Sequence, residues 1–287
     1  MRLSNRGMAL MAVMLTGLPA MPAMAQDKVA FASHDQPATR IEGWLWQPAT
    51  PGPHPAVVLL HGCGGPTTPS GKVNSRILDW SERLAAAGYV ALAVDSFGPR
   101  GIKSTCGKGA ARLAPGVRID DALGALAFLR GQAPVQGDRV AAFGWSAGAQ
   151  TVLGLVNDGT GNAARLPGGN FRAAVAFYPG CRGFNENSRW RARIPLQIEM
   201  GAADDWTPAA PCEALARRRQ AAGDPIAITL YPGAYHDFDA PDMKIRIREG
   251  LAHSADGTGR AHIGTDPAAR AKAIDEVMAF LQHRLKD

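Results

Sequence analysis

A serine flanked by glycines is the clearest chemical signal in this chain. The sequence GWSAG at residues 144–148 follows directly on the apolar stretch RVAAF and precedes a segment of helical character. Glycines on both sides of a serine allow a strand to turn sharply into a helix, which leaves the hydroxyl exposed at the edge of a sheet. This context predicts that Ser146 is a nucleophile rather than part of an ordinary packing turn.

A serine hydroxyl is a weak nucleophile near neutral pH, so it needs a base and a third group that orients the base. The sequence GAADDWTP follows the apolar stretch LQIEM, and YHDF follows IAITLYPG. We therefore predict that His236 is the base and Asp204 its orienting acid, with the adjacent Asp205 as the alternative acid. Four other histidines are candidates for the base, but none of them follows a strand in this order. They are His61, His253, His262 and His283.

The sequence HGCGG at residues 61–65 breaks a short apolar stretch, AVVLL. A tetrahedral intermediate needs two hydrogen-bond donors for its oxyanion, typically the amide after the nucleophile and one from the loop after an early strand. Those positions are Ala147 and Cys63. Cys63 as a thiolate nucleophile is the alternative interpretation, but no strand-turn-helix sequence surrounds it.

Three further residues are candidates for binding substrate. Arg100 lies in a long loop, residues 96–115, and a guanidinium fork suits a carboxylate. Trp145 lies beside the nucleophile and Trp206 beside the acid, so both are predicted to line an apolar acyl pocket. A solvated arginine and core tryptophans are the alternatives.

Predicted strands and helices alternate along the chain, and these elements must position the candidate residues. The predicted strands are 41–47, 56–60, 89–95, 138–143, 173–178, 196–200 and 226–231, and the predicted helices are 74–87, 117–131, 147–157, 209–222 and 267–285. Short apolar strands that alternate with helices indicate an α/β fold with a mostly parallel central sheet and helices on both faces. Sites in such folds lie at the carboxyl ends of the strands. We expect a single domain over residues 26–287.

The first 25 residues are typical of a cleaved signal peptide. Two arginines precede an apolar run from about Met8 to Leu18, and a small-x-small cleavage sequence follows at residues 23–25. The run is too short to span a bilayer. We therefore expect a periplasmic or secreted protein without a stable membrane anchor.

The charge and the four cysteines indicate which partners, metal sites and disulfides to expect. A net charge of +6 comes from scattered arginines without a basic block between aromatics, which argues against nucleic acid as a partner. The cysteines show no C-x-x-C spacing, so no metal site is expected. Cys181 and Cys212 follow consecutive strands at the same sheet edge, which makes them a candidate disulfide in an oxidising compartment. Cys63 and Cys106 are the second candidate pair.

Taken together, these segments resemble the dienelactone hydrolase family from about Ile41 to the last helix. The segments that carry the resemblance are VVLLHGCGG, YVALAVDSFGPRG, RIDDALGAL, VAAFGWSAG, MGAADDWTP and YHDF. The resemblance implies an α/β-hydrolase fold, Asp204 and His236 as acid and base, and Cys63 and Ala147 as oxyanion amides.

Two departures from the family pattern are informative. Its best-known members have a cysteine where this chain has Ser146 and a glutamate where it has Gly62. Members that act on dienelactone hold the substrate carboxylate with two arginines, of which this chain matches at most one, Arg100. This incomplete clamp argues against dienelactone itself as the substrate.

The predicted function is hydrolysis of a small-molecule carboxylic ester or lactone through an acyl-enzyme on Ser146, with no metal or organic cofactor. A peptidase or an acyltransferase with the same triad is one alternative. A non-catalytic protein that binds a small acyl compound is the other. The sequence carries no signal for an oligomeric state.

Overall fold

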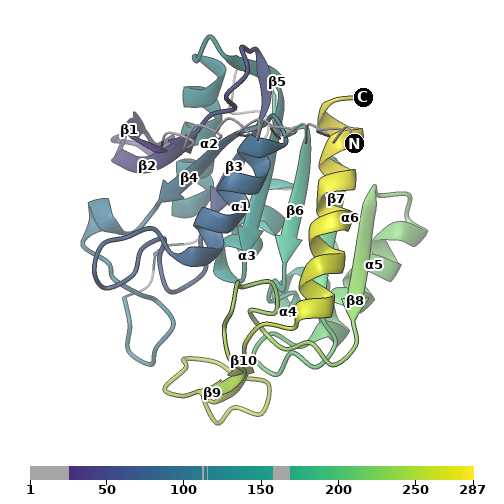
Figure 1. The fold of residues 1–287 in the computed structure, drawn as a ribbon. Helices are drawn as coiled ribbons and strands as arrows, with labels where there is room; N and C mark the ends of the chain where they lie inside the picture. Colours follow the sequence, from purple (N-terminus) through teal and green to yellow (C-terminus); the bar gives the residue numbers. More distant parts are fainter. Residues whose placement is uncertain (1–25, 112, 115, 158–168) are drawn as a thin grey trace, which may run out of the picture.

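The computed structural model describes residues 26–111, 113–114, 116–157 and 169–287 (Figure 1). Its strands are β1 (Gln26–Ala32), β2 (Arg40–Trp46), β3 (His54–Leu60), β4 (Val90–Asp95), β5 (Val135–Trp145), β6 (Ala173–Phe177), β7 (Leu196–Gly201), β8 (Ile226–Tyr231), β9 (Arg246–Arg248) and β10 (Ala261–Ile263). Its helices are α1 (Ser75–Ala86), the short η1 (Gly98–Arg100), α2 (Val117–Arg130), α3 (Ala147–Leu155), α4 (Arg182–Glu186), α5 (Ala209–Ala221) and α6 (Pro267–Leu285). Residues 1–25, where the signal peptide is predicted, lie outside the described part.

One central sheet organises the chain, in the strand order β1-β2-β4-β3-β5-β6-β7-β8. The pairs from β4 and β3 through to β8 are parallel, whereas β1 and β2 add an antiparallel edge. The middle strands β4, β6 and β7 are buried along their whole length, and β4 and β6 are accordingly almost continuous apolar runs. In Figure 1, α1 and α6 lie in front of the sheet and α2 and α3 lie behind it. The predicted α/β-hydrolase architecture is therefore confirmed.

Three strands, β1, β9 and β10, and two short helices, η1 and α4, were not predicted from the sequence. The edge strand β1 pairs with β2 alone, so most of its side chains are exposed and no buried pattern marks it. The strands β9 and β10 form a small hairpin, and at three residues each they are too short for a periodic signal. This hairpin extends beyond the end of the main sheet (Figure 1). Across the described residues, no helix combines the length and apolarity needed to cross a membrane.

Candidate active site

Ser146 occupies a sharp turn between β5 and α3, with φ 51° and ψ −114°. A β-carbon at Gly148 would lie 2.0 Å from the carbonyl oxygen of Leu60, and one at Gly144 would lie 2.4 Å from the backbone of Gly148. Only glycine therefore fits on either side of the serine. A positive φ at a non-glycine residue is a strained conformation that surrounding packing must maintain. The turn leaves Ser146 facing two pockets at the carboxyl ends of the strands.

His236 and Asp204 form a buried pair. Nδ1 of His236 lies 2.8 Å from Oδ2 of Asp204, and both side chains are almost completely buried. The other carboxylate oxygen of Asp204 accepts hydrogen bonds from the amides of Trp206 and Thr207 at 2.9 and 2.8 Å. Because an ionised carboxylate only accepts hydrogen bonds, this contact assigns the proton to Nδ1 of His236 and leaves Nε2 as the basic nitrogen.

Two aromatic rings enclose His236. Its ring centroid lies 4.4 Å from that of Tyr178 and 4.6 Å from that of Trp206. Burial by itself would lower the pKa of His236, but the charge of Asp204 and its hydrogen bond outweigh burial and raise the pKa above 6.5. Imidazolium formation during a reaction is therefore favoured by this partner.

Asp205 has a different partner. Its carboxylate accepts hydrogen bonds from the amide of His262 at 2.8 Å and contacts Nδ1 of the same residue at 2.7 Å. Asp204 and Asp205 thus point in different directions, and it is Asp204 that contacts His236.

The two pockets meet at Ser146. The large pocket has a volume of about 560 Å³ and the small pocket about 200 Å³. The apolar side chains of the large pocket include Phe97, Leu113, Ile119, Phe184 and Trp206. The small pocket is more polar than the large one, and its polar side chains include Asn74, Arg76, His236, Asp237 and Arg248. Ser146, Cys63 and Trp206 line both pockets, so the serine lies at the junction of an apolar and a polar space.

The two predicted oxyanion residues lie beside Ser146. Ala147 is the first residue of α3, so its amide has no acceptor within the helix. Of the described residues, none accepts a hydrogen bond from the amide of Cys63. A β-carbon on Gly62 would lie 3.6 Å from Cβ of Ser146, which shows how closely the loop at residues 61–65 passes the serine.

Two of the three predicted substrate-binding residues lie elsewhere. Arg100 lines neither pocket, because its guanidinium is held by the carboxylate of Asp121 through hydrogen bonds of 2.8 and 2.9 Å. Trp145 is 1% exposed and donates its indole hydrogen to Asp239 at 2.8 Å, so it belongs to the core. The prediction was wrong for both residues, since their partners lie on distant segments. Trp206 does line both pockets, and its contact with an acyl group stays a prediction.

Three arginines near the serine were not predicted. Arg118 lines the large pocket, and Arg76 and Arg248 line the small one. Arg76 pairs with Asp237 at 2.5 Å, and Arg248 lies over the ring of Trp206 at 5.2 Å. Isolated arginines on a helix or a short hairpin carry no local motif, so no sequence signal would have singled them out.

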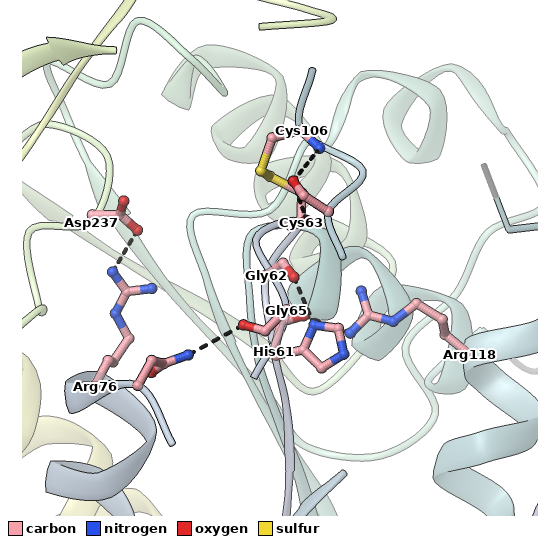
Figure 2. The surroundings of a disulfide bond; sticks show 10 residues. His61, Gly62, Cys63, Gly65, Arg76, Cys106, Arg118 and Asp237 are labelled. Atoms are coloured by element: carbon pink, nitrogen blue, oxygen red, sulfur yellow. Dashed lines mark hydrogen bonds and ion pairs between the residues drawn. A yellow bond between two sulfur atoms is a disulfide. The ribbon is translucent and has the colours of Figure 1, made fainter. Parts of the chain in front are cut away.

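Two disulfides join all four cysteines, Cys63 to Cys106 and Cys181 to Cys212. These are the two candidate pairs named from the sequence, and Figure 2 shows the first of them beside the loop at residues 61–65. Neither Cys63 nor any other cysteine is therefore a free thiol. Within the ranges that the structure describes, no group of three or more His, Cys, Asp or Glu side chains is arranged to hold a metal ion.

Comparison with solved structures identifies relatives of this architecture. A dienelactone hydrolase-like promiscuous phosphotriesterase from metagenomic libraries superposes with a TM-score of 0.65 at 22% identity, covering 91% of this chain and 99% of that one. Thermogutta terrifontis esterase 2, phosphorylated by paraoxon, has a TM-score of 0.64 at 19% identity, covering 92% and 95%. A putative dienelactone hydrolase from Klebsiella pneumoniae has a TM-score of 0.59 at 18% identity, covering 90% and 98%.

Among curated proteins, none matches this sequence. Residues 41–285 match the dienelactone hydrolase family. This match covers nearly the whole of the described chain. The protein therefore belongs to the dienelactone hydrolase family of the α/β-hydrolase superfamily, a family of carboxylic ester hydrolases.

Proposed function

We propose that this protein is a serine hydrolase that cleaves a carboxylic ester or lactone, with Ser146, His236 and Asp204 as its catalytic triad. One observation carries the proposal. Ser146 is held at a strained turn and opens onto the small pocket that also contains His236, whose Nδ1 is bound by the buried Asp204. This arrangement leaves Nε2 of His236 as the base for the serine hydroxyl.

The reaction follows from these positions. As the oxygen of Ser146 bonds to the substrate carbonyl carbon, its proton passes to Nε2 of His236. The amides of Cys63 and Ala147 stabilise the negative charge that develops on the carbonyl oxygen. The intermediate then breaks its bond to the alcohol, which takes the proton from His236, and an acyl-enzyme remains.

Water completes the cycle. It attacks the acyl carbon while His236 accepts one of its protons, and that proton returns to the oxygen of Ser146 when the carboxylic acid leaves. Asp204 holds the imidazole orientation and stabilises its charged form throughout. With a lactone, the alcohol and the acid released are parts of one hydroxy acid. All of these steps use side chains and amides of this chain.

The pockets suggest how an ester is oriented. The large pocket is lined mainly by apolar side chains, which suits the acyl part of a small molecule. The small polar pocket suits a leaving alcohol or a lactone oxygen. Two structural relatives, one described as an esterase phosphorylated by paraoxon and one as a promiscuous phosphotriesterase, are consistent with a reactive nucleophile in a protein of this fold.

Hydrolysis of p-nitrophenyl acetate by the wild type and by Ser146→Ala tests the proposal. We expect the variant to lose at least about 1,000-fold in kcat/KM, because the nucleophile is gone. A fluorophosphonate probe should label the wild type once per chain and fail to label the variant. Ser70→Ala, at an exposed serine, is the matched control and should keep both properties.

The outcomes separate the alternatives. Equal inactivity of wild type and Ser146→Ala towards ester and probe would favour a non-catalytic binding protein. Diversion of product to an added alcohol would indicate an acyltransferase, and cleavage of peptides in preference to esters would indicate a peptidase.

We also propose that residues 1–25 are a cleaved signal peptide and that the enzyme acts in the periplasm or outside the cell. Two disulfides between all four cysteines fit an oxidising compartment. Expression of the full chain followed by cell fractionation and N-terminal sequencing tests this. An uncleaved N-terminus in the cytoplasmic fraction would contradict it.

A further inference from the structure

The peptide unit between Gly62 and Cys63 is held firmly at its carbonyl end. The oxygen of Gly62 accepts hydrogen bonds from Nδ1 of His61 at 2.7 Å and from the amide of Gly65 at 3.2 Å, and Figure 2 shows the first of these. A trans peptide is planar, so its N–H points away from its C=O. Fixing the Gly62 carbonyl therefore fixes the direction of the Cys63 N–H, the proposed oxyanion donor.

The preceding carbonyl is held as well. The oxygen of His61 accepts a 2.5 Å hydrogen bond from the guanidinium of Arg118, a residue of α2. His61 itself is buried, and burial together with the nearby charge of Arg118 lowers its pKa well below 6.5. His61 is thus neutral at physiological pH, and its single ring proton is the one directed at the Gly62 carbonyl.

These hydrogen bonds fix the direction of the Cys63 N–H, whereas its distance from Ser146 also depends on what holds Cys63 itself. Three of the five residues in the loop at 61–65 are glycines, whose backbone is unusually free. On the other side of the peptide, Cys63 is joined covalently to Cys106, and its carbonyl accepts a 2.8 Å hydrogen bond from the amide of Thr105. The donor is therefore tied at two points to the segment around Cys106.

That segment is anchored in turn. The carbonyl of Cys106 accepts a 2.8 Å hydrogen bond from the amide of Ala252, and Cys106 packs in a small buried cluster with Leu251 and Ala261. Cys63 and Trp206 pack against the same cluster. The disulfide thus joins the loop beside the serine to the segment around Cys106, which contacts the chain between β9 and β10. That chain has a further attachment, because the amide of Ala255 donates a 2.8 Å hydrogen bond to the carbonyl of Asp205.

We propose that the disulfide between Cys63 and Cys106 is a positioning element of catalysis, which holds the Cys63 amide where the oxyanion forms. This inference rests on the proposed function. The other disulfide, Cys181 to Cys212, has a sequence separation of 31 residues against 43 for the first, and it lines neither pocket. It is therefore a matched control for any general effect of losing a cross-link.

The test compares Cys63→Ala/Cys106→Ala with Cys181→Ala/Cys212→Ala, using p-nitrophenyl acetate. Its two-carbon acyl group needs little of the large pocket, so ground-state binding should change little. We expect the first variant to lose about 10- to 100-fold in kcat, somewhat less than deletion of an oxyanion donor costs, with KM nearly unchanged. Phosphonylation by a fluorophosphonate should slow in parallel, whereas the control variant should keep both rates.

Thermal unfolding of each variant separates this role from stability alone. A lowered melting temperature with an unchanged kcat in the folded Cys63→Ala/Cys106→Ala protein would overturn the inference. If Ser146→Ala were as active as the wild type, the proposed function itself would fail instead.

A second measurement applies if the double variant does not fold. The folded wild type is reduced with a trialkylphosphine, and the released thiols are alkylated and located by mass spectrometry. Activity that falls in step with opening of the Cys63–Cys106 bond supports the inference. Full activity after that bond has opened would contradict it.

Discussion

The indole of Trp145 donates a 2.8 Å hydrogen bond to the buried carboxylate of Asp239. Trp145 directly precedes the proposed nucleophile, and Asp239 lies three residues after the proposed base. The same carboxylate accepts hydrogen bonds from Trp80 at 3.0 Å and from the hydroxyl of Tyr178 at 2.5 Å. Asp239 therefore connects the strand that ends at the nucleophile, the ring that packs on His236 and the loop that carries His236.

Asp239→Asn should lower the free energy of unfolding by about 2–4 kcal/mol, because an amide places a donor where the carboxylate accepts only, leaving a buried donor unpaired. Urea denaturation followed by tryptophan fluorescence measures this. Asp242→Asn is the control, since Asp242 is exposed and its positive φ suits asparagine. A midpoint for Asp239→Asn equal to that of the wild type would contradict the role of this carboxylate.

The adjacent aspartates offer a matched pair of variants. Asp204→Asn should lower kcat by about 10²- to 10⁴-fold, because the amide cannot hold His236 in the required tautomer. Asp205→Asn should leave kcat nearly unchanged, since Asp205 contacts His262 instead. Steady-state hydrolysis of p-nitrophenyl acetate by both variants measures this. The reverse ranking would make Asp205 the triad acid.

The pH dependence of kcat/KM should report His236. The base must be neutral to accept the serine proton, so kcat/KM rises as pH increases through the pKa of His236. Burial lowers this pKa, but the charge and hydrogen bond of Asp204 raise it further, so the midpoint should lie above 6.5.

Asp204→Asn removes the negative charge of Asp204, which raises the pKa of His236, while burial, which lowers that pKa, remains. The midpoint of the residual activity should therefore move to lower pH. Asp205→Asn should keep the wild-type midpoint and serves as the control. A profile without any inflection between pH 5 and 9 would argue against His236 as the base.

Glu199 makes the stability of the fold depend on pH. Burial raises the pKa of Glu199 from 4.5 to about 8, although hydrogen bonds from Tyr231 and Gln197 act in the opposite direction. Between these two pH values the folded protein binds more protons than the unfolded chain. Its free energy of unfolding should therefore fall by a few kcal/mol as pH rises across this range, from this group alone.

Glu199→Gln removes the titrating group, so it should reduce this loss and be more stable than the wild type at pH 8. Urea denaturation at pH 5 and pH 8 measures the difference. Glu186→Gln, at an exposed position, should behave like the wild type at both values. An equal loss of stability in Glu199→Gln and the wild type would show that other groups cause the dependence.

The central part of the fold could be predicted from the sequence because its signals are local. Buried strands appear as short apolar runs, helices as amphipathic or alanine-rich stretches, and the turn at residues 144–148 as two glycines around a serine. The candidate site residues Ser146, Asp204 and His236 were found by their position after successive strands. Parallel strands bring such positions to one edge of a sheet, so the order along the chain was sufficient.

Tertiary structure alone decided which side chains face the pockets. Asp204 and Asp205 are neighbours in sequence, and only the path of the loop directs one to His236 and the other to His262. Arg100 is held outside the pockets by its hydrogen bond to Asp121. Trp145 lies in the core, where it donates a hydrogen bond to Asp239, 94 residues away. The direction of a side chain depends on contacts between distant segments, and the residues next to it in the sequence do not reveal those contacts.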